Sequence, residues 1–516
     1  MARIVVSDPL SPEGFALLEA RGHEAVDVTS LEGDARADAI AGAEGWVVRS
    51  GTRIGPDELA AAPKLRGIGR AGVGVDNVDL GAATNRGIAV FNSPTGNITS
   101  AAEQAWALML GAARRVPEAD AAMKAEDWAR KRLKGSELAG KTLFIVGLGK
   151  IGRMMAKRAQ AFEMTCIGHD PFVTPEAAKG FGVEWVEVDD GMARADIISL
   201  HTPLVPATKD LIDARRLGLC KKGAMLVNAA RGGLMVADDV LAALESGQLG
   251  SAGIDVWPDE PPTDWSLAKH PRVVAAPHLG ASTVEAQTKA AVQACERLCD
   301  FLDTGDAGLA VNAVATVPEA LRPWADLAGC LACFAAQTVE GAIEELVICA
   351  TPGLDAAALE VPAVAGALRS SSETPINAIN APGLAKAQGW TVATKALPED
   401  DDKYLRVHVR TKKGERIVEG TYTPHYGPRV TSVDGFDVEF RARGRLLVTL
   451  HDDVPGVLAR ITGVLAEAQV NVAAVSLARK GGQAIGVIEV DGSIPRDARD
   501  ALRGIAAVNQ AHRVRL

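Results

Sequence analysis

The sequence lacks the long apolar segments that mark membrane proteins and secreted precursors. No uninterrupted apolar run reaches the about 18 residues that a membrane-spanning helix requires. The first residues, from Met1 to Asp8, contain no apolar core of a secretory signal. We therefore expect a cytoplasmic protein that does not bind a membrane.

A cysteine framework is also missing. The seven cysteines, at positions 166, 220, 295, 299, 330, 333 and 349, are odd in number and show no repeated spacing, so no disulfide network is expected. Cys330 and Cys333 have the spacing of a metal or redox motif, but they lie in a helix predicted over 324–338. No second cysteine or histidine pair has a metal-binding spacing. We interpret these cysteines as buried helix residues and predict no metal site.

Positive charge is in deficit rather than excess. The chain has 55 Lys and Arg against 65 Asp and Glu, a formal net charge of −10. Nucleic acids and anionic membranes attract basic surfaces, so neither is expected as a main partner. A chain of 516 residues with 47% hydrophobic and 23% charged residues is typical of globular proteins with about three or four domains.

A glycine-rich turn follows an apolar run at 143–146. Gly147, Gly149 and Gly152 form a Gly-x-Gly-x-x-Gly pattern that leads directly into a predicted helix over 153–162. In a dinucleotide-binding turn, the first glycine allows the sharp bend and the second lets the backbone approach a pyrophosphate. The third lets the helix pack close to the strand. Such a pattern alone is a weak signal in a chain with 52 glycines.

An acidic residue at the right distance strengthens this interpretation. A second apolar strand is predicted over 164–168, and Asp170 follows it. The interval from Gly147 is close to the about 20 residues expected for an acid that binds the ribose hydroxyls of NAD. An acid here, rather than a base, favours NAD over NADP. An ordinary glycine-rich turn remains the alternative.

The first 95 residues alternate between predicted strands (3–7, 24–28, 45–50 and 65–70) and helices, which indicates a parallel sheet covered by helices. Ligands of such sheets bind beyond the carboxyl ends of the strands. Arg49, with Ser50 beside it, and Arg70 both end a strand, so an anion-binding edge is plausible. Two solvated arginines are the alternative. An alanine-rich helix over 100–114 and a polar stretch over 117–140, which includes Arg130, come next.

From 142 to 279 strand candidates recur regularly, with helices between them, which predicts a doubly wound sheet of about six strands or more. Its strand ends carry Asp170, His201, Arg231, Asp255 and His278. Oxidation of a secondary alcohol by NAD needs a base for the hydroxyl proton and a cation for an adjacent carboxylate. His278 is the best candidate for the base, with His201 as a competitor.

Two further residues fit this chemistry. Glu260 lies in a proline-rich loop before the last strand and could orient the imidazole of His278. Arg231, flanked by small residues after another strand, could bind a carboxylate through two hydrogen bonds. Sequence spacing alone does not bring Arg231, Glu260 and His278 together in space.

Three motifs, Asn228 to Gly233, Gly253 to Trp257 with Glu260-Pro261-Pro262, and Pro277 to Gly280, resemble the D-isomer-specific 2-hydroxyacid dehydrogenase family. Within it, Gly69 to Asn77 and His278 to Thr283 are most similar to the branch that oxidises 3-phosphoglycerate for L-serine synthesis. The resemblance covers residues 1 to about 315. It implies an Arg–Glu–His triad at Arg231, Glu260 and His278, NAD as the cofactor and a homo-oligomer, either a dimer or a tetramer.

The resemblance also implies the site residues and the domain order. Substrate-binding positions would be Arg49, Ser50, Arg70, Gly72, Arg130, Arg231 and His278, with Arg130 reaching a neighbouring subunit. Cofactor-binding positions would be Val73, Gly147, Gly149, Lys150, Ile151, Gly152, Asp170, Thr202, Ala229, Ala230, Arg231, Asp255, His278, Leu279, Gly280 and Ala281. Lys150 stands where the family usually has Arg, and Val73 where it often has Thr. A Rossmann domain at 96–281 would be inserted into a flavodoxin-like substrate domain at 1–95 and 282–315.

The C-terminal third divides into two expected α+β domains. Residues 316–444 show no catalytic pattern and match, by length, an intervening domain of the family's long forms; a loop is predicted around 421–428. Residues 445–516 read strand, helix, strand, strand, helix, strand and resemble an ACT regulatory domain. The resemblance implies L-serine as effector and His451, Asp453 and Asn471 as its contacts. Some relatives have Asn at the position of Asp453. A purely structural or dimerising domain is the alternative.

Two rival functions remain at this stage. Reductases of 2-oxoglutarate, glyoxylate or hydroxypyruvate use the same three catalytic residue types. A binding protein of the co-repressor type would use the same fold to sense NADH without turnover.

Overall fold

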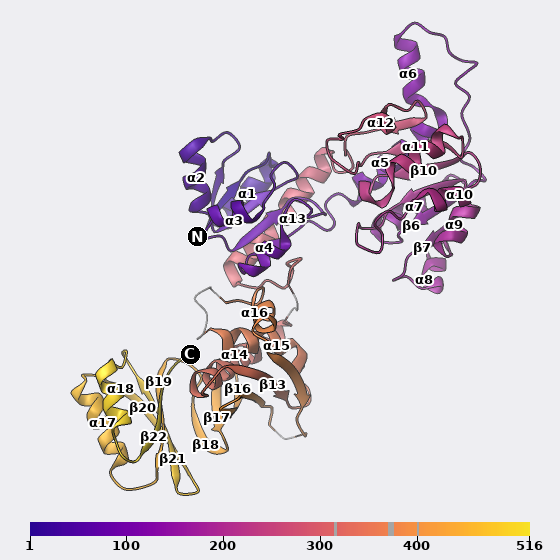
Figure 1. Cartoon of the computed structure of the whole chain (residues 1–516). Helices are drawn as coiled ribbons and strands as arrows, with labels where there is room; N and C mark the ends of the chain where they lie inside the picture. Colours follow the sequence, from indigo (N-terminus) through magenta and orange to yellow (C-terminus); the bar gives the residue numbers. More distant parts are fainter. Residues whose placement is uncertain (314–316, 370–375, 400–401) are drawn as a thin grey trace.

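The computed structural model describes residues 1–313, 317–369, 376–399 and 402–516. The predicted end of the returning segment, at residue 315, lies outside the described residues. Within the described residues, no helix combines the length and the apolar character needed to cross a bilayer. The chain forms four sheets, which follow one another along the sequence (Figure 1).

The first sheet is parallel and has the strand order β2-β1-β3-β4-β5, the flavodoxin-like order. Its apolar strands are short and buried on both faces by helices, as expected for a parallel sheet. We call this sheet with its helices and α13 the substrate lobe. Its elements are β1 (Arg3–Val6), α1 (Pro12–Ala20), β2 (Glu24–Asp27), α2 (Gly33–Ala41), β3 (Gly45–Val48), α3 (Pro56–Ala61), β4 (Gly67–Arg70), α4 (Leu80–Asn85) and β5 (Ala89–Phe91).

The second sheet has seven parallel strands in the order β12-β11-β10-β9-β6-β7-β8, which reverses at β6 as in a Rossmann fold. We call it, with its helices, the nucleotide lobe. Its strands are β6 (Thr142–Val146), β7 (Thr165–His169), β8 (Glu184–Trp185), β9 (Ile197–Leu200), β10 (Ala224–Asn228), β11 (Leu249–Ile254) and β12 (Val273–Ala275). Its helices are α5 (Ile98–Arg114), α6 (Val116–Lys124), α7 (Lys150–Ala161), α8 (Pro175–Gly180), α9 (Val188–Arg194), α10 (Ala214–Leu219), α11 (Ala237–Glu245) and α12 (Ser266–Lys269).

The chain then returns to the first sheet. Helix α13 (Val284–Thr304) packs against α1 and β4 of the substrate lobe (Figure 1). Two glycines of β4 permit this close packing: a Cβ at Gly67 would lie 2.8 Å from Leu298, and one at Gly69 would lie 3.1 Å from the carbonyl of Ala294. The Rossmann sheet is therefore inserted into a flavodoxin-like fold, as predicted.

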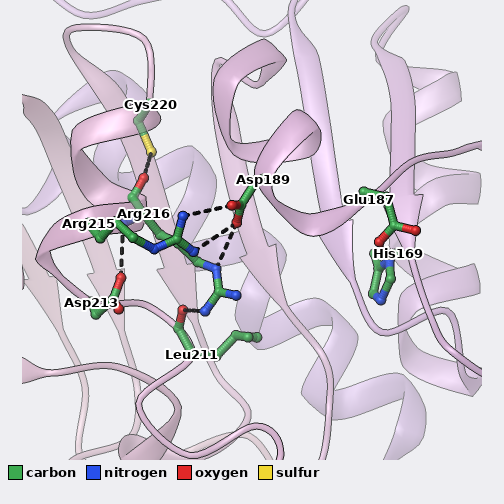
Figure 2. A network of polar contacts seen from close by, with 8 residues as sticks. All are labelled: His169, Glu187, Asp189, Leu211, Asp213, Arg215, Arg216 and Cys220. Carbon is green, nitrogen blue, oxygen red and sulfur yellow. Dashed lines mark hydrogen bonds and ion pairs between the residues drawn. The ribbon is translucent and has the colours of Figure 1, made fainter.

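The surface of the nucleotide lobe carries a projecting helix, α6, and a set of polar contacts between α9 and α10. Helix α6 begins the stretch that was predicted only as polar, and it projects away from the sheet (Figure 1). On the opposite part of this lobe, Asp189 of α9 accepts hydrogen bonds from Arg215 and Arg216 of α10 (Figure 2). These contacts join two neighbouring helices at the surface.

The third sheet has six strands in the order β14-β13-β15-β16-β17-β18, with α14 and α15 packed on it. The loop predicted around 421–428 is correct only at its centre: residues 424–426 form a turn, whereas the flanking residues form a β-hairpin in which Thr423 pairs with Gly427. Gly427, at φ +72°, supplies the left-handed turn that joins the two strands. The elements are α14 (Arg322–Thr338), β13 (Ile343–Ala350), α15 (Ala356–Leu368), α16 (Ala381–Ala387), β14 (Thr391–Ala396), β15 (Leu405–Thr411), β16 (Gly414–Thr423), β17 (Gly427–Val433) and β18 (Phe436–Arg441).

The last sheet is antiparallel, with the order β20-β21-β19-β22 and two helices on one face. The βαββαβ order is as predicted, and the turn at Gly481-Gly482 joins β20 to β21. The elements are β19 (Arg445–Asp452), α17 (Val457–Glu467), β20 (Val472–Lys480), β21 (Gln483–Val490), α18 (Arg496–Arg503) and β22 (Val508–Arg515).

Candidate active site

A carboxylate and an imidazole form the centre of the candidate site. Nδ1 of His278 lies 2.6 Å from Oε2 of Glu260, and Oε1 of Glu260 accepts the backbone N–H of Trp257. Burial raises the pKa of Glu260, but the hydrogen bonds from His278 and Trp257 outweigh it, so the net pKa lies below its ordinary value. Glu260 is therefore ionised near neutral pH, and Nε2 of His278 remains available for a ligand.

The backbone of His278 is held in an unusual conformation. Its φ of +56° is uncommon for a residue with a side chain. The neighbouring Asp255, fully buried at the end of β11, stabilises it: the Asp255 carbonyl accepts the His278 N–H, and its carboxylate accepts the N–H groups of Leu279 and Gly280. Gln104 donates a third hydrogen bond to this carboxylate. The loop that carries the imidazole is thus fixed by a buried acid.

Arg231 follows β10 and reaches the same place. Asn228, fully buried, accepts the N–H of Ala230 and donates to the carbonyl of Arg231, which fixes the turn. A Cβ at Gly232 would lie 2.0 Å from the backbone of Trp257, so only glycine lets this turn approach the loop that carries Glu260. The positive charge of Arg231 contributes to the low pKa of Glu260. Arg231, Glu260 and His278 therefore converge, although they end three different segments.

The substrate lobe contributes two cations from its strand ends. Arg70 ends β4 and lies over Gly72, where a Cβ would come 1.4 Å from the guanidinium. Burial and the neighbouring Arg231 lower the pKa of Arg70, and its Nε is buried without a hydrogen-bond partner. Arg49 follows β3 and donates to the carbonyl of Pro9. A buried, unpaired guanidinium nitrogen beside another arginine is the arrangement that an anionic ligand would complete.

An ion pair joins the two lobes. Nη2 of Arg231 lies 3.2 Å from the carboxylate of Asp76, which belongs to the loop after β4. Gly74 makes room for this pair, since a Cβ there would lie 2.2 Å from Arg231 and 2.5 Å from Asp76. The sequence interpretation quoted Asp76 only as part of a motif.

The glycine-rich turn fits a dinucleotide. Gly147 has a φ of +96°, and a Cβ on Gly152 would lie 2.0 Å from the Gly147 carbonyl, so both positions require glycine. Gly149, which caps α7, faces nothing within 4 Å. The N–H groups of the first turn of α7 are therefore open to a pyrophosphate. The acid predicted to bind ribose, Asp170, accepts the N–H groups of Leu148 and Phe172, and each oxygen keeps a lone pair for a hydroxyl.

His201, the competing histidine, has a different environment. Its ring contacts the hydroxyl of Ser199 at 2.8 Å, and its carbonyl lies 2.5 Å from the Cβ that Gly147 lacks. Burial lowers the pKa of His201 to about 4. A neutral imidazole with so low a pKa is a poor proton acceptor, which favours His278 as the base.

The other predicted positions surround these groups at the facing edges of the two lobes. The backbone carbonyl of Val73 accepts a hydrogen bond from Asn92, and Leu279 is exposed. The partly or largely exposed positions are Ser50, Lys150, Ile151, Thr202, Ala229, Ala230 and Ala281. Arg130 is exposed in the segment that follows the projecting α6. Sequence analysis missed Asp8, an acid at the end of the first strand whose position was the available signal.

The candidate effector residues do not converge in one chain. His451 is buried, its Nδ1 donates to the carbonyl of Asp452, and its Nε2 has no partner, while Asp453 contacts Arg479. Both His451 and Arg479 align with Ala484 of β21. Asn471 instead binds Asp491 beyond Val490, at the other end of β21. Six residues of strand separate these rows, which is about 20 Å.

Comparisons with known proteins agree with this architecture. The family model of the D-isomer specific 2-hydroxyacid dehydrogenase, NAD binding domain, matches residues 106–280. The D-3-phosphoglycerate dehydrogenase intervening domain matches 320–434, and the ACT domain matches 444–507. The nucleotide lobe is therefore an NAD-binding domain, and a regulatory-type domain ends the chain.

Solved structures resemble the first half of the chain. A glyoxylate reductase from Paecilomyes thermophila is 28% identical, with a TM-score of 0.53, and covers 61% of this chain and 98% of its own. A D-lactate dehydrogenase from Aquifex aeolicus, complexed with NAD and lactic acid, is 25% identical, with a TM-score of 0.51, and covers 58% and 95%.

Curated relatives extend over the whole chain. A D-3-phosphoglycerate dehydrogenase from Bacillus subtilis is 35% identical over 502 residues and covers 95% of both chains. One from Methanocaldococcus jannaschii is 36% identical over 518 residues and covers 98% of both. The chain therefore belongs to the D-3-phosphoglycerate dehydrogenase family, a long form of the D-isomer-specific 2-hydroxyacid dehydrogenases.

Proposed function

We propose that this chain oxidises D-3-phosphoglycerate to 3-phosphohydroxypyruvate with NAD, the first committed step of L-serine synthesis. The name of the full-length relatives supports this substrate. The observation that carries the chemistry is the pair of Glu260 and His278, 2.6 Å apart, with Arg231 beside it. A base oriented by an ionised acid, next to a cation, is what dehydrogenation of a 2-hydroxy acid needs.

His278 acts as the base. Glu260 accepts the Nδ1 proton of His278, which leaves Nε2 as the acceptor for the substrate hydroxyl proton and stabilises the imidazolium that results. Arg231 binds the carboxylate next to the reacting carbon through its fork of N–H donors and polarises the developing carbonyl. NAD, when bound, accepts the hydride from the same carbon. The His278 loop is already fixed by Asp255 in the conformation that presents the ring.

The phosphate distinguishes this substrate from simpler hydroxy acids. Arg70, whose buried Nε has no partner, and Arg49, from the neighbouring strand end, would bind it with Ser50 and Gly72. A dianionic phosphate beside two arginines gains charge-assisted hydrogen bonds that a methyl group or a hydrogen atom could not make. Arg130 would reach the site of a second copy.

The cofactor positions follow the edge of the nucleotide lobe. Gly147, Gly149 and Gly152 form the pyrophosphate turn, with Lys150 and Ile151 in the first turn of α7, and Asp170 binds the ribose. Val73, Thr202, Ala229, Ala230, Leu279, Gly280 and Ala281 would border the rest of the cofactor. In this scheme Asp255 contributes through the loop that it holds.

Regulation by L-serine needs two copies of the chain. His451 and Asp453 lie about 20 Å from Asn471 along the sheet, so a site that contains all three must take Asn471 from a second copy. Such a site requires a homo-oligomer, a dimer or a tetramer.

We place the reaction in the cytoplasm, because all seven cysteines are free thiols, which reducing compartments preserve.

A substrate panel tests the proposal. The purified chain is assayed for NADH formation with 3-phosphoglycerate, and in the reverse direction with glyoxylate, 2-oxoglutarate and hydroxypyruvate. The highest kcat/KM should belong to the phosphorylated substrate pair. No turnover of 3-phosphoglycerate would refute the proposal. NADH binding without turnover of any acid would favour a sensing protein instead.

A further inference from the structure

Asp8 is the most extensively hydrogen-bonded acid near the strand ends of the substrate lobe, and it takes no part in the catalytic scheme above. It follows β1, between the ends of β2 and β3, and only 7% of its surface is exposed. Its Oδ2 accepts the backbone N–H of Arg49 at 2.6 Å and that of Thr52 at 3.1 Å. Its Oδ1 accepts the hydroxyl of Thr52 at 2.9 Å. One carboxylate thus satisfies three donors of a single loop.

The loop from Arg49 to Thr52 is held from the opposite side as well. The side-chain amide of Asn77 donates to the carbonyls of Arg49 and Thr52, both at 2.6 Å. Asp8 therefore binds the N–H groups at the two ends of the loop, and Asn77 binds the carbonyls of the same two residues. The four-residue loop has little freedom to change shape while both contacts persist.

The loop packs closely against the carboxylate of Asp8. A Cβ on Gly51 would lie 2.7 Å from Oδ1 of Asp8, so the loop approaches this acid as closely as glycine permits. The charge of Asp8 also partly offsets the mutual repulsion of the arginines, because it acts on Arg70 in the opposite sense to Arg49 and Arg231. The acid therefore acts on both the geometry and the electrostatics of the anion-binding edge.

We infer that Asp8 is a positioning residue that shapes the Arg49–Thr52 loop to receive the anionic group of the substrate. This role rests on the proposed function, since it assumes that Arg49 binds that group. Asp8 does not itself touch the substrate; it fixes the backbone from which Arg49 and Ser50 project. Loss of its three acceptor contacts would leave two partly buried N–H groups without their acceptor and release the loop.

Steady-state kinetics of two Asp8 variants test this role. Asp8→Ala should raise the KM for 3-phosphoglycerate about tenfold or more, since each unsatisfied buried donor is costly. The kcat and the KM for NAD should stay within about twofold, because the nucleotide lobe is untouched. Asp8→Asn keeps an oxygen that can accept both N–H groups, so it should restore most of the substrate affinity.

Asp27 provides a matched control on the neighbouring strand. It ends β2 and accepts the backbone N–H and the hydroxyl of Thr29, much as Asp8 does for Thr52, but it lies at the outer edge of the sheet. Asp27→Ala should leave both KM values unchanged. An Asp8→Ala enzyme with an unchanged KM for 3-phosphoglycerate, or with equal losses for substrate and NAD, would overturn the positioning role.

A second variant covers the case in which Asp8→Ala does not fold. Thr52→Val removes only the hydroxyl that donates to Asp8, and it should raise the KM for 3-phosphoglycerate about two- to fivefold at constant kcat. Where Asp8→Ala does not fold, an unchanged KM for 3-phosphoglycerate in Thr52→Val would refute the inference. Failure of the wild type to oxidise 3-phosphoglycerate would refute the proposed function instead; the Asp8 variants would then be measured with the acid that is oxidised.

Discussion

The catalytic half brings its candidate ligand-binding residues together, whereas the C-terminal sheet holds its candidate effector residues apart. Arg70, Arg231, Glu260 and His278 are far apart in sequence, yet they converge at the edges of two lobes. His451 and Asn471 are close in sequence, yet an entire strand length separates them. The difference follows from topology. The catalytic residues follow the carboxyl ends of parallel strands, which share one edge of a sheet. His451 lies at the end of β19 and Asn471 directly precedes β20. Both strands are antiparallel to β21 and so run in the same direction, which places the end of one and the start of the other at opposite edges.

This comparison indicates how many chains each site needs. The three catalytic residues that the resemblance implies, Arg231, Glu260 and His278, meet within one chain. An effector site with His451 and Asn471 cannot form within one chain. A single substitution in the catalytic site should therefore reduce the activity of the chain that carries it. The response to L-serine should instead depend on which variant chains are paired.

The largest expected effect tests the catalytic side. His278→Ala removes the group that accepts the hydroxyl proton, and kcat should fall by about 10³-fold or more. The affinity for NADH, measured by fluorescence titration, should stay within about threefold, because the glycine turn and Asp170 are unchanged. His201→Ala offers the comparison with the other strand-end histidine. A small loss in the His278 variant and a large one in the His201 variant would reverse the assignment.

The second expected effect concerns the partner of the imidazole. Glu260→Gln keeps the size of the side chain but removes the charge that fixes and stabilises the imidazole, so kcat should fall about 10- to 100-fold. Because the pKa of Glu260 lies below its ordinary value, the wild-type carboxylate stays ionised at neutral and alkaline pH. The Glu260→Gln deficit in kcat should therefore persist from neutral to alkaline pH. A deficit that disappears as the pH rises would contradict this role.

Sequence analysis found residues at strand ends and missed contacts between loops. The strand ends and the glycine turn could be predicted, because apolar periodicity and parallel order determine which residues share an edge, and the inserted topology followed from the family resemblance. Asp8 and the Arg231–Asp76 ion pair were not predicted. The contacts of Asp8 depend on how two loops of the substrate lobe fold against each other, and the ion pair depends on how the two lobes pack. The hairpin at Thr423 and Gly427 was missed because polar turn residues next to a proline resemble a loop when the strand partner is unknown.

The third prediction tests the need for two chains. Homo-oligomers of His451→Ala and of Asn471→Ala should each lose the response to about 1 mM L-serine, in both activity and thermal stability. Differently tagged chains of the two variants, coexpressed and purified through both tags, should regain the response at one site per pair, because one site of each mixed pair keeps both residues.

A matched mixture serves as the control. Two differently tagged Asn471→Ala chains should remain unresponsive to L-serine after the same purification. Mixed oligomers that behave like their parents would show that His451 and Asn471 do not share a site across chains. A wild type that neither binds L-serine nor changes its thermal stability would remove the effector role altogether.

The smallest expected effect concerns the ion pairs of Asp189 on the surface of the nucleotide lobe, outside both the catalytic site and the candidate effector site. The two arginines of α10 lower the pKa of Asp189 to about 2 (Figure 2). The folded-state pKa is below the unfolded value of about 4, so the contribution to stability is complete above about pH 4 and is lost as the pH falls toward 2. These side chains are exposed, so Asp189→Asn should lower the free energy of unfolding by at most about 1 kcal/mol at pH 7.

Urea unfolding of Asp189→Asn and of its neighbour Asp190→Asn measures this contribution. Asp190 pairs with Arg194 of the same helix, α9, and such a contact is worth about 0.3–0.5 kcal/mol. Asp190→Asn should therefore lower the free energy of unfolding less than Asp189→Asn does. The difference between Asp189→Asn and the wild type should shrink from pH 4 downward. Equal losses in both variants, or a loss that does not change with pH, would mean that the α9–α10 contact adds nothing beyond general surface charge. The catalytic rate should be the same in both variants, since neither helix carries a residue of the site.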